Sequence, residues 1–244
     1  MQAFRQFIKK KGFKRVALVA ETTDYGVGIA DEMKAQGKAA GDKVDLMEIT
    51  FDHATTDLTP QLLQVKAFKP DLVINVAVGQ PVDLMIDEAT TLGILPGAAM
   101  LVSYDAPARP QYWQLHPKDG NGIYFIAYYS PKEKLSELGQ WLATAYEAKY
   151  KEVPIYSSLN GFGDVLILAQ AVDQAKSSDP KAVVKALETG TFKSWAESPV
   201  TFPAGKGVYW HNWSPPILVI HYTKPNEDWR QAEVVLEHVG TTPP

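Results

Sequence analysis

The sequence predicts an α/β fold built on a parallel β-sheet, and three observations support this prediction. Five short runs rich in Val, Ile, Leu and Tyr recur early in the chain, at residues 15–20, 44–50, 71–78, 100–104 and 122–126. Segments with a helical spacing of apolar residues separate these runs. The 244 residues are 45% hydrophobic and 21% charged, which is enough for one or two domains with a buried core. Strands that alternate with helices in this way are typical of a parallel sheet covered on both faces.

The first two helices are indicated by their apolar spacing. Met1 opens a short amphipathic segment with Phe4, Phe7 and Ile8 on one side. A second amphipathic run extends over residues 27–37, after the first predicted strand.

The next two helices have start and stop signals. Thr59 and Pro60 are residue types preferred at the N-cap and at the first helical position, and Pro81 has the equivalent place in the following helix. Gly93 and Pro96 are expected to end that helix.

The pattern changes after residue 129, where three helices follow without intervening strands. Residues 130–133, Ser-Pro-Lys-Glu, match a capping box, so the first of these helices is expected to begin there. The second is expected over residues 158–175, and the third from Asp179 to near Gly190. The wide apolar face predicted for the second helix comprises Leu159, Phe162, Val165, Leu166, Leu168, Ala169 and Val172.

Short strands are expected in the tail, at residues 200–202, 216–222 and 232–236, where the chain returns to a sheet. The aromatic run at residues 209–213 is interpreted as packing, because Trp and Tyr bury large apolar areas. The three late helices also need an apolar surface to cover. Either they form a bundle with one another, or they belong to a second lobe whose strands precede Met1.

Composition excludes several classes of partner. A net charge of −4 and a pI near 5.8 argue against a nucleic-acid or anionic-membrane surface. No stretch approaches the roughly 20 apolar residues that a membrane span needs, and the N-terminus lacks the apolar core of a secretory signal. The absence of cysteine fits a protein outside the reducing cytosol, although many cytosolic chains also lack cysteine.

Signals for enzyme chemistry are weak. Gly26 and Gly28 follow a strand as in a dinucleotide-binding loop, but Asp31 occupies the position of the third glycine. Neither a GxSxG elbow nor a GxxxxGK[ST] phosphate loop is present, and the five histidines lack the spacing of metal ligands. The sequence therefore predicts no catalytic residue, no cofactor and no metal.

A ligand site is expected where the predicted parallel strands end. In open α/β sheets, ligands bind beyond the carboxyl ends of the strands, where loops and helix N-termini meet. The polar turn Glu-Thr-Thr-Asp-Tyr-Gly after the first strand lies at such a place. The residues expected to share the pocket are Thr23, Tyr25, Val78, Gly79, Gln80, Tyr104 and Asp105.

Each of these residues also has a structural interpretation. Tyr25 before a glycine could simply close a turn and pack on the sheet. Asp105 could be the N-cap of a short helix around Pro110. Arg109 could pair with a ligand carboxylate, but a solvated loop arginine is the preferred interpretation.

Three segments resemble the branched-chain amino-acid type of ABC-transporter periplasmic binding protein. They are KRVALVAETTDYGVGIADEM, FDHATTDLTPQLLQVKAFKPDLVINVAVGQ and SLNGFGDVLILAQAVDQAKSSDPKAVVKALETGTF. The resemblance combines the Tyr-Gly motif, the Thr-Pro helix start, the Lys-Pro-Asp before a strand and the alanine-rich helix before Ser-Asp-Pro. The order and spacing of these motifs extend over almost the whole chain.

The resemblance implies a type I periplasmic-binding fold, with two α/β lobes that close on a small ligand. Residues 1–125 and 200–244 are expected to form the complete second lobe, a Rossmann-like parallel sheet. Residues 126–200 are expected to be the helical remainder of the first lobe. Its leading strands, together with a signal peptide, would then lie upstream of Met1.

The resemblance also implies roles for single residues. Asp105 matches the acidic position that faces the ligand ammonium, and Tyr25 matches a tyrosine that forms the pocket wall. Gly79 and Gln80 match the loop between strand and helix, whereas Val78 stands where relatives often have tyrosine. The carboxylate-binding groups of the family belong to the absent lobe, so none is named here.

The expected function is therefore that of a non-enzymatic solute receptor in the periplasm. It captures a branched-chain or related aliphatic or aromatic amino acid, or a related carboxylate, between its lobes and presents it to an ABC permease. The alternative is an α/β enzyme or regulatory sensor that binds a nucleotide or another metabolite at the same sheet edge.

Overall fold

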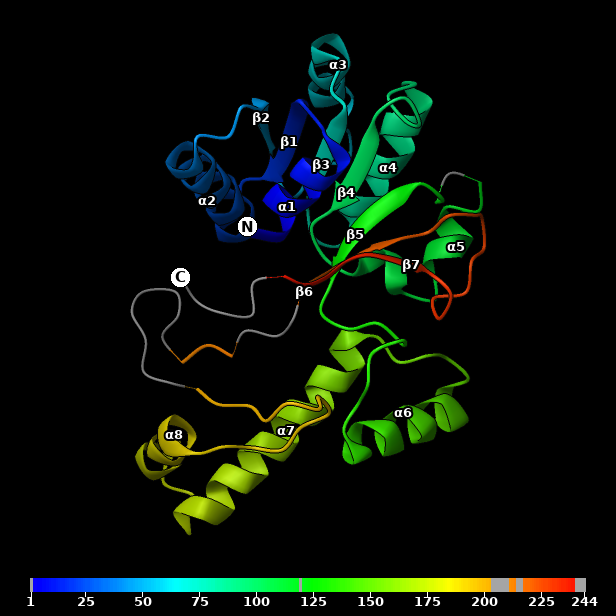
Figure 1. Cartoon of the computed structure of the whole chain (residues 1–244). Helices are drawn as coiled ribbons and strands as arrows, with labels where there is room; N and C mark the ends of the chain where they lie inside the picture. The colour runs from blue at the N-terminus through cyan, green and yellow to red at the C-terminus, as the bar shows by residue number, and fades with distance from the viewer. Residues whose placement is uncertain (1, 119, 203–210, 214–216, 240–244) are drawn as a thin grey trace. The chain divides into compact units, whose positions relative to one another are not determined.

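The computed structural model describes residues 2–118, 120–202, 211–213 and 217–239 (Figure 1). The chain divides into two compact units. The first comprises Met1–Ala127 and Ile217–Val239, and the second comprises Tyr128–Pro216 and Gly240–Pro244. No helix in the described part combines the length and the apolar character needed to cross a membrane.

The first unit contains a seven-stranded sheet, as far as the described residues show, in the order β2-β1-β3-β4-β5-β6-β7. The five predicted strands of the first half are confirmed, and neighbours among them pair in parallel. The last two strands add to β5 in antiparallel pairing, as expected for a tail that returns to the sheet. The bounds are β1 Arg15–Glu21, β2 Asp45–Phe51, β3 Leu72–Val76, β4 Ala99–Val102, β5 Ile123–Ala127, β6 Ile217–His221 and β7 Glu233–Val239.

Helices accompany this sheet, and Figure 1 shows α2 beside β2 at one end and α5 near β7 at the other. The residues of β3 are all buried, as is β1 after Arg15, because helices cover the central parallel strands. The predicted amphipathic segment forms α1, in which Phe4, Phe7 and Ile8 are buried. The bounds are α1 Gln2–Lys11, α2 Asp24–Ala40, α3 Thr59–Phe68, α4 Gln80–Thr91, η1 Ala106–Ala108 and α5 Tyr112–Leu115.

Two helix starts in the first unit differ by one residue from expectation. Thr59 is the first residue of α3 and not its N-cap, which is Leu58. The Thr59 N–H donates to Asp57 Oδ1 at 2.9 Å, so the capping oxygen comes from Asp57. Helix α4 begins at Gln80, one residue before Pro81, and its N-cap Gly79 has φ 71°, a backbone conformation that favours glycine.

The second unit contains α6 (Glu137–Tyr150), α7 (Tyr156–Ala175) and α8 (Pro180–Thr189). The capping box expected at residues 130–133 is wrong, because Ser136 is the N-cap of α6 and its Oγ accepts from the Gly139 N–H at 3.0 Å. The residue before Ser136 is held by a tertiary contact, since Leu135 forms an isolated antiparallel β-bridge with Ala196. The third helix is confirmed, with Asp179 as N-cap and Gly190 after its end.

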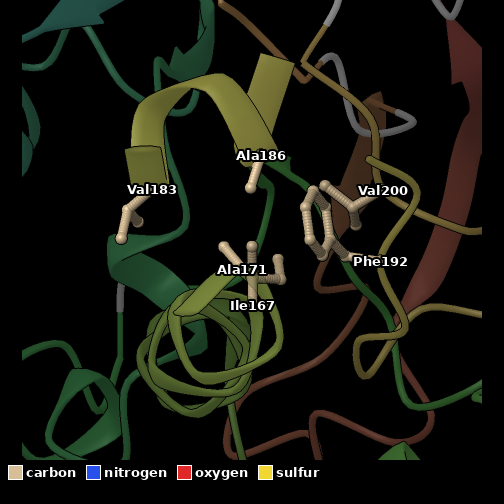
Figure 2. Packing of buried hydrophobic residues seen from close by; sticks show 6 residues of the cluster. All are labelled: Ile167, Ala171, Val183, Ala186, Phe192 and Val200. Atoms are coloured by element: carbon tan, nitrogen blue, oxygen red, sulfur yellow. The ribbon is translucent and has the colours of Figure 1, made fainter. Parts of the chain in front are cut away.

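The buried face of α7 also differs from the predicted face. Its buried residues are Leu159, Gly163, Ile167 and Ala171, whereas Val165 is 70% and Leu168 is 52% exposed. Small residues on the buried side allow close contact with neighbouring segments. Figure 2 shows this packing around Ile167, Ala171, Val183, Ala186, Phe192 and Val200.

The tail of the second unit has little regular structure in its described part. The strand expected at residues 200–202 is reduced to an isolated bridge between Val200 and Phe192. Tyr209 and Trp210 of the aromatic run lie outside the described residues. Trp213 packs edge-on against Trp195, with ring centroids 6.0 Å apart, which agrees with the packing interpretation.

Candidate functional site

The carboxyl ends of β1, β3 and β4 form a continuous edge in the first unit. These strands are neighbours in the sheet and run in the same direction. The loops that follow them therefore meet at one edge. All seven residues expected in the pocket belong to these loops or to the helix starts just after them: Thr23, Tyr25, Val78, Gly79, Gln80, Tyr104 and Asp105.

Hydrogen bonds connect these loops across the sheet. The Tyr25 hydroxyl donates to Ser103 Oγ at 2.8 Å, which joins the start of α2 to the end of β4. The Gly79 N–H donates to the Tyr104 hydroxyl oxygen at 3.0 Å, which joins the loop after β3 to the loop after β4. Two of the expected pocket residues, Gly79 and Tyr104, are therefore in direct contact.

Exposure varies along this edge. Tyr25, Val78 and Gln80 are exposed, whereas Thr23 and Tyr104 are half-buried. An aromatic ring and an aliphatic side chain are thus accessible beside exposed polar groups. Such a surface suits a small ligand with both an apolar and a polar part.

Asp105 is a buried carboxylate, 7% exposed, that follows β4. Its Oδ2 is buried and receives no hydrogen bond from any residue that the structure describes. Burial raises the pKa of Asp105, and the charge of Arg109 only partly opposes this shift. Asp105 does occupy the N-cap position of η1, but its side chain makes no capping hydrogen bond.

Arg109 is an exposed loop residue, as expected. Its guanidinium lies 5.5 Å from the centre of the Tyr104 ring, within the range of a cation–π contact.

Glu21 is a site residue that sequence reasoning missed. It ends β1, is 2% exposed, and accepts hydrogen bonds from Thr23 Oγ1 at 2.7 Å and from the Val78 N–H at 2.9 Å. His53 Nδ1 lies 2.9 Å from the same carboxylate. Burial alone would raise the pKa of Glu21, but the hydrogen bonds from Thr23, His53 and the Val78 N–H outweigh burial and lower the pKa. A charged residue at the end of an otherwise apolar strand was the available signal.

A groove of about 1270 Å³ lies elsewhere in the first unit, between α1, α2 and β2. Its lining includes residues 12–14 and 41–44, which precede β1 and β2, so it is distant in the fold from the carboxyl edge. Two of its cations already have carboxylate partners, because Arg5 pairs with Asp42 at 2.6 Å and Lys34 with Glu48 at 3.0 Å.

His116 is a buried histidine between two carboxylates of α4. Its Nε2 lies 2.9 Å from Asp83 Oδ1, and its Nδ1 lies 3.0 Å from Asp87 Oδ1. The arrangement connects the end of α5 to α4. Within the described ranges, no group of three or more His, Cys, Asp and Glu side chains could hold a metal ion.

A comparison against protein families matches the periplasmic binding protein model to residues 1–214. The chain belongs to this family.

A curated relative is consistent with membership of this family. The Leu/Ile/Val-binding protein BraC3 of Rhizobium johnstonii is 27% identical over 209 residues, which are 82% of this chain and 53% of that protein. This chain therefore spans about half the length of that relative.

Solved structures show the same type I periplasmic-binding fold. A leucine binding protein, LivK, from Thermotoga maritima has a TM-score of 0.81 at 19% identity, over 97% of this chain and 64% of that chain. An amino acid ABC transporter substrate-binding protein from Pseudomonas fluorescens Pf-5 has a TM-score of 0.80 at 18% identity, over 96% and 62% of the two chains.

Proposed function

We propose that this chain is part of the solute-binding component of an ABC importer and binds a small amino acid at the carboxyl edge of β1, β3 and β4. The ligand is a branched-chain or related aliphatic or aromatic amino acid, or a related carboxylate. The names of the relatives support this class, because they are leucine-type and amino-acid binding proteins. These names also support a role without a chemical step.

The observation that supports the proposal best is that Asp105 is buried and its Oδ2 has no hydrogen-bond donor among the described residues. A buried carboxylate oxygen without a hydrogen-bond donor is costly, because this oxygen has lost water and gained no donor in exchange. The ammonium group of an amino acid supplies three donors and a positive charge. Binding therefore relieves a cost that is already present in the unliganded protein.

The other residues of the edge contribute shape and polar contacts. Tyr25 provides an aromatic wall, Val78 and Tyr104 provide further apolar surface, and Thr23, Gly79 and Gln80 provide polar atoms near the helix starts. We propose that the groups that bind the ligand carboxylate come from other segments than these, as the resemblance implies. We further propose that the complete protein, meaning this chain together with the segments that its relatives have outside the matched region, works in the periplasm and delivers the ligand to a membrane permease.

Calorimetric titration tests this function. Leucine, isoleucine, valine and phenylalanine are titrated into the complete protein, with a nucleotide as a ligand of a different class. Stoichiometric heat without product formation is the expected result for at least one amino acid. Saturable chemical conversion of a ligand, or binding of the nucleotide alone, would contradict the proposal.

A further inference from the structure

We propose that Glu21 is a positioning residue for the ligand edge. Its carboxylate holds the turn after β1, the segment after β2 and the loop after β3 in one arrangement, and it does not contact the ligand. This inference rests on the proposed function and adds a residue to the same site.

The three donors to Glu21 come from three different connections. Thr23 Oγ1 donates to Oε1 at 2.7 Å from the turn before α2. The Val78 N–H donates to Oε2 at 2.9 Å from the loop before α4. His53 Nδ1 lies 2.9 Å from Oε2 and belongs to the segment between β2 and α3. One carboxylate has about four acceptor positions, so a single side chain is sufficient for all three.

The Val78 N–H has its acceptor in Glu21. Strand β3 ends at Val76, so the sheet ladder provides no carbonyl for the Val78 N–H. A buried carboxylate is costly without donors, and Glu21 is almost fully buried although Val78 is exposed. The carboxylate therefore fixes the backbone direction at the first exposed residue after β3.

The next residue is fixed from the opposite side. The Gly79 N–H donates to the Tyr104 hydroxyl oxygen at 3.0 Å, and Gly79 has φ 71°. Two successive N–H groups thus bind side chains from β1 and from the loop after β4. Together these contacts determine how Val78, Gly79 and Gln80 face the ligand.

The turn between Glu21 and α2 is equally constrained. A Cβ atom on Gly26 would lie 1.9 Å from the Glu21 carbonyl oxygen, so the start of α2 contacts the end of β1 directly. Thr23 Oγ1 also accepts from the Gly26 N–H at 3.4 Å while it donates to Glu21. Because Tyr25 is the second residue of α2 and directly precedes Gly26, the Glu21 contact also positions the aromatic wall.

The two buried carboxylates of the edge therefore have different roles. Both oxygens of Glu21 are occupied by protein donors, whereas Asp105 Oδ2 has no donor from the described residues. A ligand ammonium would therefore be the missing donor at Asp105, whereas Glu21 already has its donors from the protein.

The test compares Glu21→Gln with Asp71→Asn as a matched control. Asp71 also accepts two backbone N–H groups, from Lys14 at 2.7 Å and from Arg15 at 2.9 Å, but at the opposite end of β1. Amide hydrogen exchange is followed by NMR on the full chain without ligand. Glu21→Gln should accelerate exchange at Val78 and Gly79 by about tenfold or more, because the charged acceptor is lost. Asp71→Asn should change exchange near Lys14 and leave Val78 unchanged.

A second measurement needs no variant. As acid protonates Glu21 in the wild-type protein, the Val78 amide proton should move upfield with the same midpoint as the Glu21 carboxyl carbon. Unchanged Val78 exchange in Glu21→Gln, or a Val78 amide shift that does not follow the Glu21 titration, would overturn the positioning role. If the wild type binds none of the amino acids, the proposed function fails, but these two readouts still decide the role of Glu21.

Discussion

Glu21 and Asp105 lie at the same sheet edge and have pKa values shifted in opposite directions. Hydrogen bonds stabilise the charged form of Glu21 more than burial destabilises it, so its pKa is lowered. At Asp105, burial outweighs the charge of Arg109 and a backbone hydrogen bond, so its pKa is raised. The difference separates Glu21, which we propose to organise the edge, from Asp105, whose Oδ2 has no hydrogen-bond donor among the described residues.

Replacing Asp105 by alanine should weaken amino-acid binding by the complete protein by about 2 to 5 kcal/mol, because the ligand ammonium loses its buried partner. Calorimetry measures this loss. Asp71→Asn serves as the control, since Asp71 accepts from Lys14 and Arg15 at the far end of β1 and should leave affinity unchanged. A loss smaller than about tenfold would remove Asp105 from the site.

Asp105→Asn should make the unliganded chain more stable at neutral pH, because the buried charge is removed. A carboxyl group with a raised folded-state pKa lowers stability as the pH rises from its unfolded pKa through its folded pKa. The advantage of the variant should therefore be largest near pH 7 and shrink as the pH falls toward about 4. Thermal unfolding of both proteins across this range measures the trend, and an equal difference at every pH would contradict it.

At the level of elements, helix α7 contains two glycines in different surroundings. A Cβ on Gly161 would meet no atom within 4 Å, whereas a Cβ on Gly163 would lie 2.5 Å from Ser194 Oγ and 2.9 Å from Trp195 Cδ1. Close packing on one side of α7 thus requires glycine at one position only.

Gly161→Ala should stabilise the second unit by up to about 1 kcal/mol, because alanine favours the helix. Gly163→Ala should destabilise it by about 1 to 3 kcal/mol, because overpacking outweighs the same helical gain. Chemical denaturation of the two variants measures both effects, and each variant is the control for the other. Equal changes of the same sign would show that α7 does not pack closely on Ser194 and Trp195.

Sequence patterns predicted most elements because their signals are local. Buried apolar runs marked β1 and β3, and Asp179 before a proline marked the start of α8. The start of α6 could not be predicted in this way, because contacts of residues 135–136 with residues 194–196 delay it until Ser136. Glu21 was missed for a related reason, since its partner Val78 lies far along the chain.

The site was predicted from the same local signals, and it remains a prediction as a binding site. The expectation that the strands are parallel was enough to place Tyr25, Gly79 and Asp105 at one edge. The exposed Val165 and Leu168 show where apolar periodicity alone chose the wrong face of α7. Small residues such as Gly163 and Ala171 contribute to the buried face. A search for large apolar side chains at helical spacing does not detect such residues.

At the scale of the whole molecule, the residues proposed to contact the ligand all come from one edge of one sheet. A small ligand is usually enclosed over most of its surface, and these loops leave Tyr25 and Val78 exposed. The 244-residue chain by itself should therefore bind amino acids weakly, with a Kd no tighter than about 100 μM. Calorimetry beside the complete protein tests this, and low-micromolar binding by the chain would show that it already contains a full site.

The order of strands in the first unit also determines when its sheet can be completed on the ribosome. Strand β5 pairs with β6, yet the whole of Tyr128–Pro216 is synthesised between them. At about 5 to 20 residues per second, the open side of β5 waits for about 5 to 20 s before its partner emerges. An unpaired strand edge is a template for association with other chains, so β5 carries this hazard until β6 has been synthesised.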